Sequence, residues 1–185
     1  MFSTSVRLTG VCDVRPYTMT LMLPYDKIAS RDDRAFPLDE FAAYPRLIVM
    51  DWREEEPRIL KAFFKATGLP IDTAKLETSS TSEYYQLVRG DVRIDVPWSE
   101  NVSAQHSMLV ALQQLFGATH SIRYLNHAAV SDGGYFVVET NDAWRSLNTR
   151  NPNVRWFFTP IDLLPDVFKS DVEILARIGQ EYGDA

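Results

Sequence analysis

Residues 46–70, RLIVMDWREEEPRILKAFFKATGLP, decide the fold class. The apolar run 46–50 is short, which is typical of a buried central strand. The residues after it predict a helix, because glutamates and Pro57 suit a first turn, whereas Gly68 and Pro70 suit an end. The apolar residues of this helix recur at helical spacing and form one face: Ile59, Leu60, Phe63 and Phe64. The stretch therefore predicts a strand followed directly by an amphipathic helix.

Further helices are indicated toward the C-terminus. One begins after Asn101 or Ser103 and ends at Gly117, with an apolar stripe of Met108, Leu109, Leu112, Leu115 and Phe116. A short helix starts at Asn141 or Asp142 and contains Trp144 and Leu147. Ser170 and Glu173 have capping-box spacing before a last helix that carries Val172, Leu175, Ile178 and Tyr182.

Strands and loops alternate irregularly with these helices. Strands are predicted at 6–8, 17–23, 84–88, 92–96, 122–125, 135–139 and 154–159, and loops at 26–36 and 73–82. Gly90 with Asp91 suits a hairpin turn. Because strands and helices neither alternate strictly nor segregate, we expect one α+β domain over residues 1–185. Its mixed, mostly antiparallel sheet would be packed by about three to four helices.

Composition limits the class of protein. The 185 residues are 45% hydrophobic, which is enough for a sizeable core, and 19 basic against 25 acidic residues give a net charge of −6. Such a surface repels phosphate backbones and anionic lipid, so we expect neither a nucleic-acid nor a membrane partner. The single cysteine, Cys12, cannot form an intramolecular disulfide. With no secretory signal and no run of ~20 apolar residues, the expected location is the cytoplasm.

Motifs for catalysis and cofactors do not occur. Eight glycines are present, but they form neither a P-loop nor a dinucleotide-binding pattern. The histidines, His106, His120 and His127, lack metal-ligand spacing, and no nucleophile elbow is found. We therefore expect no catalytic residue, no metal and no cofactor. An enzyme whose site forms only in three dimensions remains an alternative, and it predicts that these histidines or Cys12 converge with a carboxylate.

Paired carboxylates add little to the enzyme alternative. Asp91 with Asp95, or Asp51 with Glu54, has the composition of an acid/base pair. Such pairs arise by chance in an acidic chain, and helix capping with solvated faces accounts for them.

Two clusters combine a tryptophan with carboxylates, which is the composition of a surface that binds a basic protein. In the first, Trp52 stands beside acidic residues: Asp51, Glu54, Glu55 and Glu56. In the second, Trp98 lies between Asp95 and Glu100. The competing interpretation is that both tryptophans are buried and that the acids only keep the surface soluble. We predict these eight residues as the partner-binding site.

The last third of the chain has an order of predicted elements that is similar to one in known proteins. The segments Ile122-Arg123-Tyr124-Leu125 and Asp132-Gly133-Gly134-Tyr135-Phe136-Val137-Val138, then Trp144 and Arg155-Trp156-Phe157-Phe158, look like the strand–strand–helix–strand tail of small bacterial proteins. In size, acidity and lack of catalytic motifs, the chain resembles the immunity proteins that bacteria pair with polymorphic or contact-dependent toxins. The resemblance implies a non-catalytic protein that occludes the basic groove of a toxin, a nuclease among the candidates. A small-ligand or regulatory module is the other alternative, and it predicts a pocket lined by Tyr84 and Tyr85 or by the aromatics at 156–158.

Overall fold

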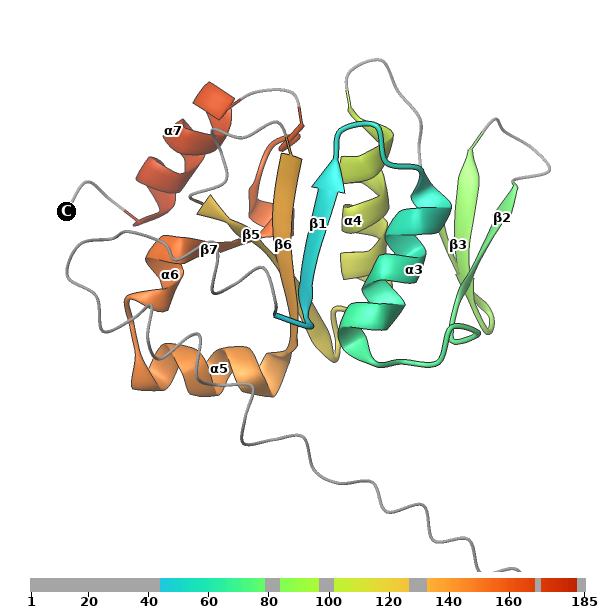
Figure 1. The fold of residues 1–185 in the computed structure, drawn as a ribbon, viewed down its shortest axis with the longest axis horizontal. Coiled ribbons are helices and arrows are strands. Elements are labelled where there is room, and N and C mark those ends of the chain that lie inside the picture. The colour runs from blue at the N-terminus through green and yellow to red at the C-terminus, as the bar shows by residue number, and fades with distance from the viewer. Residues whose placement is uncertain (1–43, 79–83, 97–101, 127–132, 169–170, 183–185) are drawn as a thin grey trace, which may run out of the picture.

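The computed structural model describes residues 44–78, 84–96, 102–126, 133–168 and 171–182 (Figure 1). In chain order, the elements are β1 Leu47–Asp51, α3 Glu56–Thr67, β2 Lys75–Thr78, β3 Tyr85–Arg89, β4 Val92–Val96, α4 Ala104–Phe116, β5 His120–Leu125, β6 Gly133–Thr140, α5 Asn141–Arg150, α6 Val154–Phe157, β7 Phe158–Pro160, the 3-10 turn η2 Ile161–Leu163 and α7 Asp171–Tyr182. The strands predicted at 6–8 and 17–23, the loop at 26–36, and the possible cap residues Asn101 and Ser170 lie outside the described residues.

The described strands form two antiparallel sheets. One has the order β1-β6-β5-β7 and the other the order β2-β3-β4. Helices α3 and α4 lie between the two sheets, whereas α5, α6 and α7 lie on the far side of the four-stranded sheet (Figure 1). The α+β class is therefore confirmed. The expected single mixed sheet is replaced by two antiparallel sheets, because α4 packs against β3 and β4 on one side and against β5 on the other.

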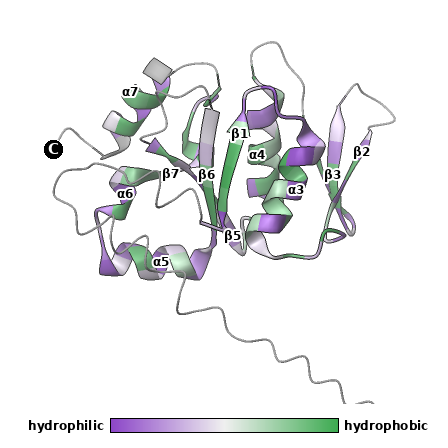
Figure 2. Cartoon of the chain, viewed as in Figure 1, coloured by the Kyte–Doolittle hydropathy of each residue, from purple (hydrophilic) through white to green (hydrophobic). Residues whose placement is uncertain are grey.

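Helix α3 has the limits that its sequence predicts. Pro57 occupies the first turn, where no backbone N–H is needed, and Gly68 ends the helix with a φ of 70° and an N–H bonded to Phe64 O at 2.9 Å. Ile59 and Phe63 are fully buried, so the predicted apolar face is confirmed. Figure 2 shows the hydrophobic colour along β1 and the hydrophilic colour at the start of α3.

Helix α4 is the centre of the core. Ser103 caps it, since the Ser103 hydroxyl accepts the His106 backbone N–H at 3.2 Å. Met108, Leu109 and Leu112 are fully buried, and Phe116 packs 4.9 Å from the Phe63 ring. The predicted cap and apolar stripe are both confirmed, although Leu115 is only partly buried.

The apolar run of β1 predicted a central strand, but the described strands do not place β1 at the centre of its sheet. Among the described strands it stands at one end of the four-stranded sheet. Ile48 and Met50 are 2% exposed, but Val49 between them is 55% exposed. An unbroken apolar run has no period, so it does not reveal whether one face or both faces of the strand are covered.

Three further predictions were wrong in detail. The predicted loop at 73–82 contains β2, whose exposed side is polar and whose Glu77 pairs with Arg93 at 2.7 Å. The predicted strand at 154–159 is a helical turn, α6, followed by β7. Among the side chains of α7 that the structure describes, Ile174 is buried and the predicted Ile178 is partly buried, whereas the predicted Leu175 is 50% exposed. The other predicted elements that fall within the described residues are confirmed, including the hairpin turn, where Gly90 has a φ of 58°.

Candidate partner-binding site

The first predicted cluster lies where β1 ends and α3 begins, at the upper edge of the ribbon in Figure 1. We call residues 51–56 the corner surface. Asp51 and Glu55 are exposed, and Trp52 is 52% exposed, so the interpretation that this tryptophan is a core residue is wrong. Glu54 and Glu56 are half-buried. The prediction of an accessible aromatic ring among carboxylates therefore holds geometrically for this cluster.

Local contacts hold the corner surface in shape. Asp51 Oδ1 accepts the backbone N–H of Arg53 at 2.9 Å, which forms a turn directly after β1. The guanidinium carbon of Arg53 lies 4.3 Å from the centroid of the Trp52 ring, within the range of a cation–π contact. Glu54 Oε1 is 3.4 Å from Arg58 Nη1. Four carboxylates against two arginines leave residues 51–58 with a negative charge of two.

The second predicted cluster is described only at Asp95. This residue is exposed on β4, in the three-stranded sheet, and its Oδ1 accepts a hydrogen bond from Gln86 Nε2 at 2.8 Å. Trp98 and Glu100 lie outside the described residues. The corner surface is therefore the predicted cluster that the described residues cover in full.

The start of α4 adjoins the corner surface and holds a polar cluster that sequence reasoning did not find. Gln105 Nε2 donates to Glu54 O at 2.9 Å, which connects α4 to the corner. Ser103 Oγ donates to Asp166 Oδ1 at 2.8 Å, and the Ser103 backbone N–H donates to the other carboxylate oxygen. Burial lowers the pKa of His106, and the nearby charge of Asp166 opposes that shift.

Ser103, His106 and Asp166 have the composition of a catalytic triad but not its connections. A triad needs the imidazole to accept the proton of the serine hydroxyl and the aspartate to hold the imidazole. Here the hydroxyl donates to Asp166 and accepts the backbone N–H of His106. The cluster is therefore a helix cap supported by a carboxylate rather than an activated nucleophile.

The two described histidines do not converge. His106 lies in the first turn of α4, whereas His120 begins the strand after that helix, and the helical rise between residues 106 and 116 is about 15 Å. Within the described ranges, no group of three or more His, Cys, Asp or Glu side chains is placed to hold a metal ion. His127 and Cys12 lie outside those ranges.

A second buried polar network lies at the opposite end of β1. The Tyr44 hydroxyl donates to Glu139 Oε1, and Arg46 Nε is 3.5 Å from Glu139 Oε2. His120 is nearby, and its pKa is lowered by burial and by the positive charges of Arg46 and Arg89. The tyrosine and the glutamate are 95 residues apart in the chain, so no local pattern could have predicted the contact.

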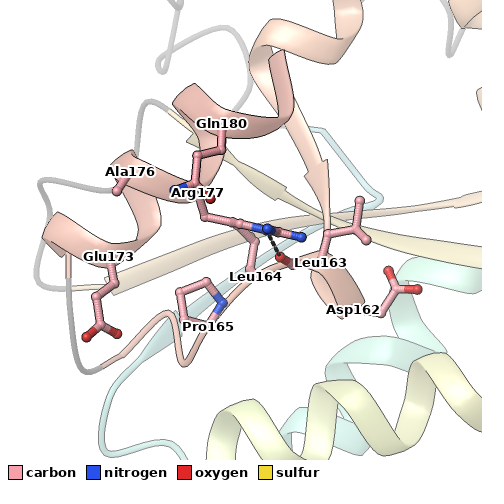
Figure 3. A pocket seen from close by; sticks show the side chains of 8 residues that line it. All are labelled: Asp162, Leu163, Leu164, Pro165, Glu173, Ala176, Arg177 and Gln180. Carbon is pink, nitrogen blue, oxygen red and sulfur yellow. Dashed lines mark hydrogen bonds between the residues drawn. The ribbon is translucent and has the colours of Figure 1, made fainter. Parts of the chain in front are cut away.

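The aromatics predicted to line a ligand pocket do not line the groove that the described residues form, and one of them, Trp156, is partly buried against the core. Phe157 and Phe158 are part of the core, whereas Tyr84 and Tyr85 lie on the surface. An open groove of about 430 Å³ lies instead between η2 and α7 (Figure 3). Arg177 crosses it, and Arg177 Nε donates to Leu163 O at 3.2 Å. The groove is lined by Asp162, Leu163, Leu164, Pro165, Glu173, Ala176, Arg177 and Gln180.

Comparisons with protein families, with curated proteins and with solved structures found no match to this chain. Across the described residues, every helix is too short or too polar to span a lipid bilayer.

Proposed function

We propose that this chain is a non-catalytic binding protein whose corner surface holds a basic partner protein. The observation that carries the proposal is Trp52, a large ring that is 52% exposed and that has the exposed acids Asp51 and Glu55 near it in the chain. Burying such a ring against a partner removes apolar area from water, and tryptophan is enriched at the energetic centres of interfaces. Fixed negative charge around the ring speeds association with a positive surface.

The Trp52 ring already stacks against a cation, the guanidinium of Arg53 at 4.3 Å. An arginine or lysine of a partner would meet the same ring and the same carboxylates. The Asp51–Arg53 turn adds rigidity, because an ordered surface loses less conformational entropy on binding.

Within this class, the role of an immunity protein in the bacterial cytoplasm fits best with the net charge of −6 and with the resemblance of the C-terminal third. The protein would lie over the basic substrate groove of a toxin, a nuclease among the candidates, and block access without chemistry. The tryptophan would fill the centre of the contact, which slows release, and the carboxylates would set the rate of association.

The test begins with affinity capture of the partner by the full chain at low and at high salt. The captured protein is then purified, and its affinity is measured for wild type, Trp52→Ala and the double variant D51K/E55K. Asp142→Lys is the matched control, because Asp142 is an exposed acid on α5, beyond the other face of the sheet. We expect a basic partner whose binding weakens with salt, a loss of at least about tenfold in both corner variants, and no loss in the control.

Toxicity supplies the second readout. If the proposal holds, wild type and Asp142→Lys protect cells that express the partner, whereas Trp52→Ala and D51K/E55K do not. Unchanged affinity in both corner variants would rule out the corner surface. A partner whose toxic activity continues in the bound complex would rule out the immunity role while leaving the binding site intact.

A further inference from the structure

Strand β1 stands at one end of the four-stranded sheet among the described strands (Figure 1). The Val138 N–H donates to Arg46 O at 3.2 Å, and this hydrogen bond fixes the pattern of the ladder between β1 and β6. Hydrogen-bonded pairs alternate with non-bonded pairs in an antiparallel ladder, so Ile48 and Met50 also bond to β6. The alternate residues of β1 direct their backbone N–H and C=O groups away from β6.

These outward groups belong to Leu47, Val49 and Asp51, and turns occupy only two of them. The Leu47 N–H donates to Tyr44 O at 3.0 Å. Asp51 O accepts the Glu54 N–H, also at 3.0 Å. Within the described ranges, no hydrogen bond is found for either backbone group of Val49, for Leu47 O or for the Asp51 N–H. Val49 is 55% exposed, so the middle of this edge is open to solvent.

The other outer strands of the described sheets are protected against the addition of a further strand. In the three-stranded sheet, the outer strands β2 and β4 both alternate charged with uncharged residues. At the other end of the four-stranded sheet, β7 is three residues long and ends at Pro160. Charged side chains, proline and short length all discourage strand addition. In contrast, β1 is apolar from Leu47 to Met50 and carries a charge only at its last residue.

The charge beside β1 indicates which strand fits the edge. Asp51 is both the last residue of β1 and the first residue of the corner surface, and residues 51–58 together carry a negative charge of two. A second copy of the chain has the same net charge of −6 and would be repelled. An extended segment with lysine or arginine side chains is attracted instead.

We propose that β1 binds an extended basic segment of the partner protein, which joins the four-stranded sheet as a further strand. Main-chain hydrogen bonds to Val49 supply affinity, as in other cases of strand addition. An apolar side chain opposite Val49 covers its exposed surface, and a basic side chain two positions along meets Asp51. The positive charge of the segment rests on the proposed function, whereas the open edge of β1 does not.

The test is a nuclear magnetic resonance titration of the full chain with a synthetic peptide. The probe is a short capped peptide with a central valine, a lysine two positions away on either side and threonine elsewhere, so it fits β1 in either direction. We expect saturable shifts and slower hydrogen exchange at the amides of Val49 and Asp51. The same peptide with methylated backbone nitrogens cannot donate the ladder hydrogen bonds and should not bind.

Val49→Pro is the decisive variant, because it removes the outward N–H and leaves the bonds of Ile48 and Met50 to β6 in place. It should lower the affinity for the peptide at least about tenfold. Protected amides at Ile48 and Met50 verify that the variant is folded. Val49→Thr is the matched control, since threonine keeps the N–H and a β-branched side chain, and it should bind like wild type.

In the free chain, the Val49 amide should exchange rapidly at every protein concentration. Protection there would mean that the chain itself or a second copy covers β1, and it would overturn the site. Equal binding of the methylated peptide, or equal binding by Val49→Pro, would overturn strand addition. Equal binding of a peptide with glutamine in place of lysine would overturn the basic occupant. If D51K/E55K keeps its affinity for the captured partner while the peptide binds β1, the proposed function fails and the open edge stands.

Discussion

The carboxylate of Asp166 accepts two hydrogen bonds from Ser103, one from Oγ at 2.8 Å and one from the backbone N–H. The two residues are 63 positions apart, and their contact attaches the segment before α7 to the first turn of α4. Negative charge at this point satisfies N–H and O–H donors and interacts favourably with the positive end of the helix dipole. Since α4 is central to the core and adjoins the corner surface, the Asp166–Ser103 contact stabilises both the core and the corner surface.

Removing the carboxylate should therefore destabilise the protein. We expect Asp166→Ala to lower the free energy of unfolding by about 1.5–3 kcal/mol, because hydrogen-bond donors at the start of α4 lose a charged acceptor. Ser103→Ala should cost about 1–2 kcal/mol as a lost cap. Urea unfolding measures the loss of unfolding free energy in each variant. The double variant should lose less than the sum of the two single losses, because both substitutions remove the same contact. Asp162→Ala, at an exposed acid in the same segment, is the control. If Asp162→Ala and Asp166→Ala lowered the free energy of unfolding equally, the stabilising role of the Asp166–Ser103 contact would be contradicted.

Stability should also depend on pH through the buried histidines. Burial lowers the pKa of both His106 and His120 from the ordinary 6.5. The unfolded chain therefore binds protons more readily than the folded protein does. The contribution that the two neutral histidines make to folding stability is fully present above about pH 6.5. It is lost as the pH falls from there through the pKa values of the folded protein.

The measurement is the free energy of unfolding at intervals from pH 7.5 to pH 5. The double variant H106Q/H120Q is expected to show a shallower decline below pH 6.5 than wild type, whatever its absolute stability. A decline of the same slope in both proteins would assign the pH dependence to other groups.

Two neighbouring residues of α7 test the packing of that helix. Ile174 is fully buried, whereas Leu175 is 50% exposed. Ile174→Ala should lower the free energy of unfolding by about 2–5 kcal/mol through lost burial and a residual cavity. Leu175→Ala should stay within about 0.5 kcal/mol of wild type. Thermal or urea unfolding distinguishes them, and the reverse ranking would mean that α7 presents its other face to the core.

Local patterns predicted much of the fold. Pro57, Gly68 and the spacing of Phe63 and Phe64 define α3, and Ser103 caps α4, because these signals act within a few residues. The predictions that were wrong involve segments without a local period. The apolar run of β1 did not reveal its exposed face, and polar β2 is a strand because β3 pairs with it. Such outcomes depend on partners distant in the chain.

For the candidate site too, some features follow from local sequence and others depend on contacts between residues far apart in the chain. The sequence by itself determined the acidic charge, the lack of catalytic motifs and the joining of Trp52 to a run of carboxylates, because these are properties of composition and adjacency. Only the tertiary structure decided that Trp52 is exposed, that Asp166 reaches Ser103, and that Tyr44 reaches Glu139. Exposure and long-range contacts depend on how the two sheets close around α3 and α4, and that packing brings together residues that share no sequence neighbourhood.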